Sequence, residues 1–211
     1  VYFVMIPSAV GLAVLREPLI RLLFETGEFN ADDTRLSAFA LLFFTVGIWA
    51  QAAIQVLTQV YYSLQETGAL VRVSAVAVAV NAVLSFLLLR ITPWGHGALA
   101  LALSLTSIVN MLNYLYLLRK KIGSIDGRRL LRTVAKSLAA SSVMAAAVWG
   151  VAAAVPLWVD TGRVAGQLVQ VGAAIAAGAA VYLLAARTLR MEELAFARAL
   201  VTRDRAPSRA D

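Results

Sequence analysis

Residues 69–91 read ALVRVSAVAVAVNAVLSFLLLRI, an apolar run whose only charged side chains are Arg72 and Arg90, near its two ends. A helix needs roughly 20 mainly apolar residues to cross the hydrocarbon core of a bilayer. The run is too long for a strand, and it does not alternate between apolar and polar residues with period two. This stretch therefore predicts a membrane-spanning helix.

Similar segments lie on both sides of this run, so we predict an all-α fold: a polytopic transmembrane helix bundle of six spans. The six run from Val1 to about Phe24, from about Leu36 to Leu64, from about Ala69 to Ile91, from about Gly97 to Leu118, from about Thr133 to Val155 and from about Val164 to Ala186. The sequence starts inside an apolar run and without methionine. We therefore expect an N-terminal part of the same protein to precede residue 1.

The composition agrees with a membrane protein. Of the 211 residues, 61% are hydrophobic and 15% are charged, whereas soluble domains have about 45–50% apolar and about 25% charged residues. Mean hydropathy is +0.78. With no cysteine and a single histidine, His96, the sequence offers neither disulfides nor a cysteine or histidine zinc site. No metal site is expected.

The positive charges predict the orientation of the spans. Net charge is +7, but the basic residues lie between and after the apolar runs, which indicates membrane topology and not nucleic-acid binding. Six-span alternation puts Arg72, the cations of residues 119–136 and the C-terminal arginines on one side. Cytoplasmic loops are enriched in lysine and arginine. The C-terminus is therefore predicted to be cytoplasmic, and the acidic segment 25–33 external.

This pattern divides the chain into four parts. They are four spans in residues 1–118, a basic cytoplasmic loop in 119–132, two further spans in 133–187, and a charged cytoplasmic tail in 188–211. Asp32 or Asp33 is expected to cap the second helix.

Residue types needed for catalysis do not come together in the sequence. No paired carboxylates lie inside a span, His96 sits in a predicted loop, and no glycine-rich phosphate loop follows a strand. We therefore expect a protein that is not an enzyme.

Polar residues inside the spans are the candidates for function, because they are costly in lipid and usually face protein or water. Gln51, Gln55 and Gln59 follow i, i+4, i+8 spacing and form one stripe on the second span. Such a stripe either bonds neighbouring helices or lines a wet cavity. Asn81 and Ser85, one turn apart on the third span, either pack by hydrogen bonds or help to hold a monovalent cation. Asn110 on the fourth span has the same alternatives.

Two other features leave alternatives open. Arg16, Glu17 and Pro18 interrupt the first span; they form either a polar kink that lines a cavity or a helix end from which Arg16 reaches the interface. The last two spans are rich in alanine and glycine, with Gly172, Ala176 and Ala180 at small-xxx-small spacing. These small residues either let helices approach closely or leave a shallow groove for an acyl chain.

Several segments resemble the C-terminal half of the MurJ/MviN family of bacterial lipid II flippases, which belongs to the MOP exporter superfamily. The resembling segments are Ile6–Leu12, with Pro7; Glu17–Phe29, with Gly27 and Phe29; Val56–Thr67, with Tyr62; Asn81; Gly97–Ala102, which begins the fourth span at Gly97; and Asn110. The order and spacing carry the resemblance. Ser85 departs from it, because some members have a carboxylate there.

The resemblance implies the last six helices of a transporter of about fourteen. The family moves a lipid-linked peptidoglycan precursor from the inner to the outer leaflet of the bacterial plasma membrane by alternating access, without hydrolysing ATP. The implied partners are membrane lipid, this precursor and the N-terminal part of the same transporter, which carries most headgroup-binding residues. The final two helices of the family border a lipid-tail groove. No cofactor is implied, apart from possible coupling to a monovalent cation.

Three other functions remain open at the level of sequence. The protein could be another lipid flippase or exporter of the same superfamily, although a drug exporter should carry buried acidic residues inside its spans. It could be a membrane scaffold that does not transport, in which case leucine at Gln51, Gln55 or Gln59 would leave transport unchanged. A membrane enzyme is disfavoured by the missing catalytic residues.

Overall fold

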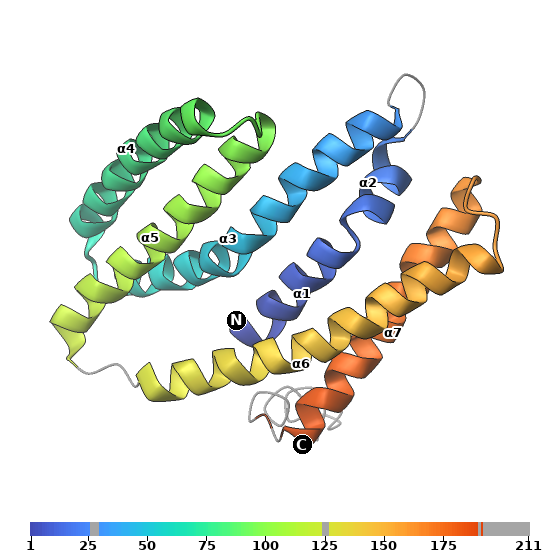
Figure 1. The fold of residues 1–211 in the computed structure, drawn as a ribbon. Coiled ribbons are helices and arrows are strands. Elements are labelled where there is room, and N and C mark those ends of the chain that lie inside the picture. The colour runs from blue at the N-terminus through green and yellow to red at the C-terminus, as the bar shows by residue number, and fades with distance from the viewer. Residues whose placement is uncertain (26–29, 124–126, 190, 192–211) are drawn as a thin grey trace, which may run out of the picture.

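The computed structural model describes residues 1–25, 30–123, 127–189 and 191, and within these ranges all regular structure is helical (Figure 1). The elements are α1 (Tyr2–Val14), α2 (Arg16–Phe24), α3 (Ala31–Ser63), α4 (Thr67–Ile91), α5 (His96–Ile122), α6 (Gly127–Ala154), the 3₁₀ turn η1 (Val155–Leu157) and α7 (Val164–Thr188). Among the described residues, five helices are long and apolar enough to cross a membrane, and α1 with α2 makes a sixth span if the bent pair counts as one. The predicted all-α membrane bundle is confirmed.

The helices form two groups joined by α1. In one group α5 packs against both α3 and α4, and in the other α6 packs against α7. Helix α1 contacts α6 on one side and α3 on the other, so it lies between the two groups (Figure 1). Tyr2 makes part of this link, because its ring lies 6.1 Å from that of Trp49 and its hydroxyl lies 3.6 Å from Met111 Sδ.

Small residues bring α3 and α5 close together. A Cβ on Gly47 would lie 2.6 Å from Ser104 Cα, so only glycine permits this approach. Ser104 uses the closeness to donate a hydrogen bond from Oγ to the Phe43 carbonyl at 2.6 Å. One core cluster continues along this contact, with Ala50, Ala53, Leu57, Tyr61, Met111 and Tyr114 among its buried members.

The contacts at the two ends of the bundle agree with six spans that cross the membrane in alternating directions. At the basic end of the bundle, Lys121 forms an ion pair with Glu66, and Lys136 Nζ donates to the Leu189 carbonyl at 2.9 Å. At the opposite end, the ring of Trp94 stacks on that of Phe43 with 5.4 Å between centroids. Each contact joins segments that the charge pattern places on the same side of the membrane.

Several predicted boundaries are wrong. Helix α3 begins at Ala31 and is capped by Asn30, not by Asp32 or Asp33; Asn30 Oδ1 accepts from both aspartate N–H groups, while Asp33 accepts from Asn30 N–H. The basic loop predicted at 119–132 is much shorter, since α5 continues to Ile122 and α6 begins at Gly127. Lysine and arginine are good helix formers and are favoured in a last helical turn, which explains the continuation of α5.

The first span is broken, as predicted, but upstream of the charged pair. Helices α1 and α2 meet at Leu15 with a bend of 73°. A proline ring clashes with the carbonyl four residues earlier, and for Pro18 that carbonyl belongs to Val14. The break at Leu15 removes this clash. The predicted cytoplasmic tail at 188–211 lies almost wholly outside the described residues.

Candidate functional site

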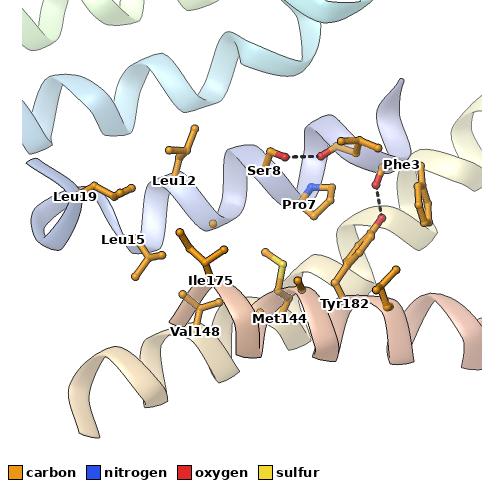
Figure 2. Close-up of a pocket in the computed structure, with 15 residues that line it drawn as sticks. Phe3, Pro7, Ser8, Leu12, Leu15, Leu19, Met144, Val148, Ile175 and Tyr182 are labelled. Atoms are coloured by element: carbon orange, nitrogen blue, oxygen red, sulfur yellow. Dashed lines mark hydrogen bonds between the residues drawn. The ribbon is translucent and has the colours of Figure 1, made fainter. Parts of the chain in front are cut away.

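An apolar groove lies between α1, α6 and α7 (Figure 2). Its volume is about 470 Å³. The lining comes from Phe3, Val4, Pro7, Ser8, Gly11, Leu12 and Leu15 of the first span with the following Leu19, from Met144 and Val148 of α6, and from Ile175, Gly178, Ala179, Tyr182 and Leu183 of α7. Hydrocarbon makes up nearly all of this surface.

The polar groups of the groove are turned towards backbone carbonyls. Tyr182 Oη donates to the Phe3 carbonyl at 2.6 Å, and Ser8 Oγ donates to the Val4 carbonyl at 2.8 Å (Figure 2). Pro7 explains the first bond, because it has no N–H to donate to the carbonyl four residues before it. The groove therefore presents few polar groups and suits an aliphatic chain better than a charged headgroup.

Helices α6 and α7 pack closely behind the groove, and the small residues at this contact are not those predicted from the sequence. A Cβ on Gly178 would lie 2.6 Å from Val148 Cγ2, and Ala174 is fully buried. Gly172, in contrast, has open space around its Cα. Ala174 and Gly178 therefore pack α7 on α6, while the predicted face with Gly172 is exposed.

The polar kink lies beside a second cavity, of about 480 Å³. Arg16, Glu17 and Pro18 line it together with residues of α3, α6 and α7. Arg16 Nη1 donates to the Ala13 carbonyl at 2.8 Å and so satisfies a group at the end of α1. Arg16 Nη2 lies 3.9 Å from Glu17 Oε1. Gln170, which also lines the cavity, donates from Nε2 to the Ala152 carbonyl at 2.7 Å.

The glutamine stripe divides into two parts. Gln51 Nε2 donates to Ser107 Oγ at 2.9 Å and so joins α3 to α5. Gln55 and Gln59, one and two turns further on, are exposed on the surface of α3. The structure thus gives Gln51 a helix–helix contact and leaves the other two amides on an open face.

The asparagines lie where α4 meets α5. Asn81 Nδ2 donates to Thr106 Oγ1 at 3.4 Å, a long hydrogen bond, and Ser85 is half-buried one turn along α4. Asn110 Oδ1 is buried and has no hydrogen-bond partner within the described residues. No group of three or more carboxylate, histidine or cysteine side chains able to hold a metal ion occurs in the described part of the chain.

The residues on which the family resemblance rests lie in different parts of the structure. Pro7 lines the groove, and Tyr62 is exposed at the end of α3. Gly97 lets α5 begin against α3, since a Cβ there would lie 2.8 Å from the Phe39 ring. Gly27 and Phe29 lie outside the described residues.

Sequence reasoning missed the groove residues of α1 and α6, among them Phe3 and Met144, and it also missed Tyr182 of α7. Only Pro7 gave a usable signal, because a proline inside an apolar helix implies a carbonyl in need of another donor. The identity of that donor depends on how α1 packs against α7.

Comparison with known proteins supplies the family. The model of the family "Lipid II flippase MurJ" matches residues 1–166. Similar proteins named "Probable lipid II flippase MurJ" occur in Haemophilus influenzae, 31% identical over 71% of this chain and 29% of the relative, and in Rhizobium tropici, 33% identical over 68% of this chain and 27% of the relative. A third, from Vibrio cholerae, is 36% identical over 53% of this chain and 21% of the relative.

The chain thus spans less than a third of the length of these relatives. The family match covers more than half of the chain and includes every helix up to the start of α7. The chain belongs to the lipid II flippase MurJ family.

Proposed function

We propose that the protein acts as part of a flippase that moves lipid II, a lipid-linked peptidoglycan precursor, from the inner to the outer leaflet by alternating access. Family membership supports the substrate class. The observation that carries the proposal within this chain is the apolar groove between α1, α6 and α7. In this account the groove receives the hydrocarbon tail, and the remainder of the transporter supplies most headgroup contacts.

The chemistry of the groove supports a tail site. A flipped lipid has to keep its tail among apolar groups while its headgroup crosses a wet cavity. The groove satisfies this need, because its walls are Leu, Val, Ile, Pro and aromatic side chains and its hydroxyls already donate to backbone carbonyls. A hydrocarbon tail bound in the groove would break no hydrogen bond of the protein and would leave no polar group of the lining unpaired.

The open face of α3 supports a wet path for the headgroup along this helix. Exposed amides facing lipid would be costly, so such residues usually face protein or water. We therefore propose that Gln55 and Gln59 face the aqueous path of the headgroup. Gln51, held by Ser107, anchors α3 at the end of this stripe.

The site between α4 and α5 has a structural role in this account. Asn81 bonds to Thr106, and Ser85 offers no carboxylate to balance a cation. We propose that these residues pack the two helices and that transport does not depend on a cation held there. The protein would lie in the bacterial plasma membrane, and the lysine and arginine distribution supports a cytoplasmic C-terminus.

The proposal is tested by filling the groove. Ala179 lines it, whereas the next residue of α7, Ala180, is exposed and does not. In cells that depend on the protein at its full natural length, Ala179→Trp should lower lipid II exposure on the outer leaflet at least about tenfold, while Ala180→Trp should leave it near the wild-type level. Equal activity of the two variants, at equal expression in the membrane, would remove the tail-groove claim.

A further inference from the structure

A third cavity, chemically different from the apolar groove, lies at the basic end of the bundle. It has a volume of about 560 Å³ and is bounded by the α3–α4 turn, the first turns of α4 and the last turns of α5. Its charged lining consists of Arg72, Lys120, Lys121 and Glu66, and Asn113 adds an amide. It shares no lining residue with the apolar groove.

The charges of this cavity do not balance. Three cations face one carboxylate, and Glu66 is already paired with Lys121. Arg72 Nε donates to the Gly68 carbonyl at 3.2 Å, which leaves the two terminal nitrogens of its guanidinium available. Across the part of the chain that the structure describes, neither Arg72 nor Lys120 forms an ion pair. The cavity thus offers two uncompensated cations to an anion.

The lining of this cavity is charged near the ends of α4 and α5 and apolar further along the two helices. Val73, Val76 and Leu117 line the same cavity beyond the charged residues. Beyond it, α4 packs little: its buried residues are Ala69, Leu70 and Val73, and large apolar side chains such as Val78 and Val83 are exposed. A ligand that fits both parts has an anionic head for the cations and a hydrocarbon chain that lies along α4.

We propose that this cavity is a binding site for the phosphate headgroup of an anionic membrane phospholipid, with an acyl chain along the exposed face of α4. Arg72 and Lys120 make charge-assisted hydrogen bonds to the phosphate oxygens, and Asn113 provides a neutral donor. Basic cavities between transmembrane helices bind anionic headgroups in this way. The site is independent of the function proposed above, since it involves neither the groove nor the glutamine stripe.

In the competing explanation there is no defined lipid site, and these cations serve only to orient the spans in the membrane. That explanation treats every cation of the basic end alike. Arg119 and Arg132 are matched to Arg72 and Lys120 in number and in side of the membrane, but they do not line the cavity. Comparing the two pairs therefore separates a defined site from general attraction to an anionic surface.

The test uses the purified protein at its full natural length in detergent, with lipid binding followed by native mass spectrometry. Wild type should bind dioleoyl phosphatidylglycerol more tightly than dioleoyl phosphatidylcholine. R72Q/K120Q should weaken phosphatidylglycerol binding about thirtyfold, as expected for two interfacial cations, with phosphatidylcholine binding unchanged. R119Q/R132Q should stay within about twofold of wild type, and R72K/K120R should retain the preference, because both variants keep the two cations of the cavity.

Three results would overturn the proposal. The first is an absence of phosphatidylglycerol preference in wild type, and the second is equal weakening by the two glutamine pairs. The third is displacement of the lipid by millimolar inorganic phosphate, which would mark a site for a soluble anion. Retention of the preference by R72K/K120R shows that the cavity is intact, so loss in R72Q/K120Q alone reports on charge.

Discussion

The hydroxyl of Tyr182 donates a hydrogen bond of 2.6 Å to the carbonyl of Phe3, and so joins the last helix of the chain to the first. The bond exists because Pro7 lacks the N–H that would otherwise serve this carbonyl within α1. The two rings also pack, with 5.4 Å between their centroids. Both residues form part of the wall of the groove (Figure 2).

Tyr182→Phe should lower the free energy of unfolding by about 1–3 kcal/mol, because it removes this donor from the carbonyl of the half-buried Phe3. Thermal unfolding in detergent measures the effect. Tyr116→Phe is the matched control, since Tyr116 is exposed on α5 and should change stability by no more than about 0.5 kcal/mol.

A double-mutant cycle tests the explanation of this bond. Pro7→Ala restores the missing N–H, so Tyr182→Phe should cost less in the Pro7→Ala background than in wild type. If the cost is the same in both backgrounds, the proline is not the reason for the bond.

Gly47→Ala should destabilise the contact between α3 and α5 by about 1–3 kcal/mol, the usual cost of overpacking. The added Cβ would lie 2.6 Å from Ser104 Cα, a backbone atom that cannot rotate away. Gly172→Ala is the control, because it meets nothing within 4 Å and adds a better helix former; it should be neutral or stabilising by up to about 1 kcal/mol. A stable Gly47→Ala protein would contradict the close packing of these helices.

Replacing Gln55 and Gln59 together by leucine should reduce lipid II exposure without lowering the unfolding temperature. Both side chains are exposed, so their role in this account is to face the aqueous path and not to hold helices together. Measurements of lipid II exposure and of thermal unfolding on the same variant separate these roles. Unchanged transport would favour a membrane scaffold over a transporter in which Gln55 and Gln59 face the path of the headgroup.

Asn81→Ala should cost only about 0.6 kcal/mol, the average for a polar contact between membrane helices. The bond to Thr106 is long, at 3.4 Å, which agrees with a modest contribution. Transport should also be the same when sodium is replaced by choline at constant membrane potential. A strict sodium requirement that disappears in Asn81→Ala would show that these residues hold the ion.

The fold was largely predictable because hydropathy and charge act over whole segments. The central part of each span could be predicted from length and composition. The ends could not, because they depend on which residue caps a helix and on how far the helix continues. Asn30 caps α3 although two aspartates follow it, because only its side chain reaches both N–H groups from the cap position. The basic residues 119–121 extend α5, since charge by itself does not end a helix.

A groove at the last two spans was one of the alternatives left open by the sequence, but its lining and the part that α1 plays in it could not be predicted. Its walls come from helices at opposite ends of the chain, and its shape depends on the contact of Gly178 with Val148. Small-residue spacing suggested another face, that of Gly172, because periodicity identifies faces of a helix without saying which face meets a neighbour. The glutamine stripe was visible in the sequence, but its division between Gln51 and the other two depends on where Ser107 lies.

Photo-crosslinking from inside the groove tests the central claim most directly. A benzophenone amino acid at Ala179, in the protein at its full natural length, should crosslink to radiolabelled lipid II in membranes, and the same group at Ala180 should crosslink mainly to bulk phospholipid. Excess unlabelled lipid II should compete away the Ala179 product. Equal labelling from both positions, or labelling from Ala179 that excess lipid II does not reduce, would contradict the assignment of this groove to the tail of the transported lipid.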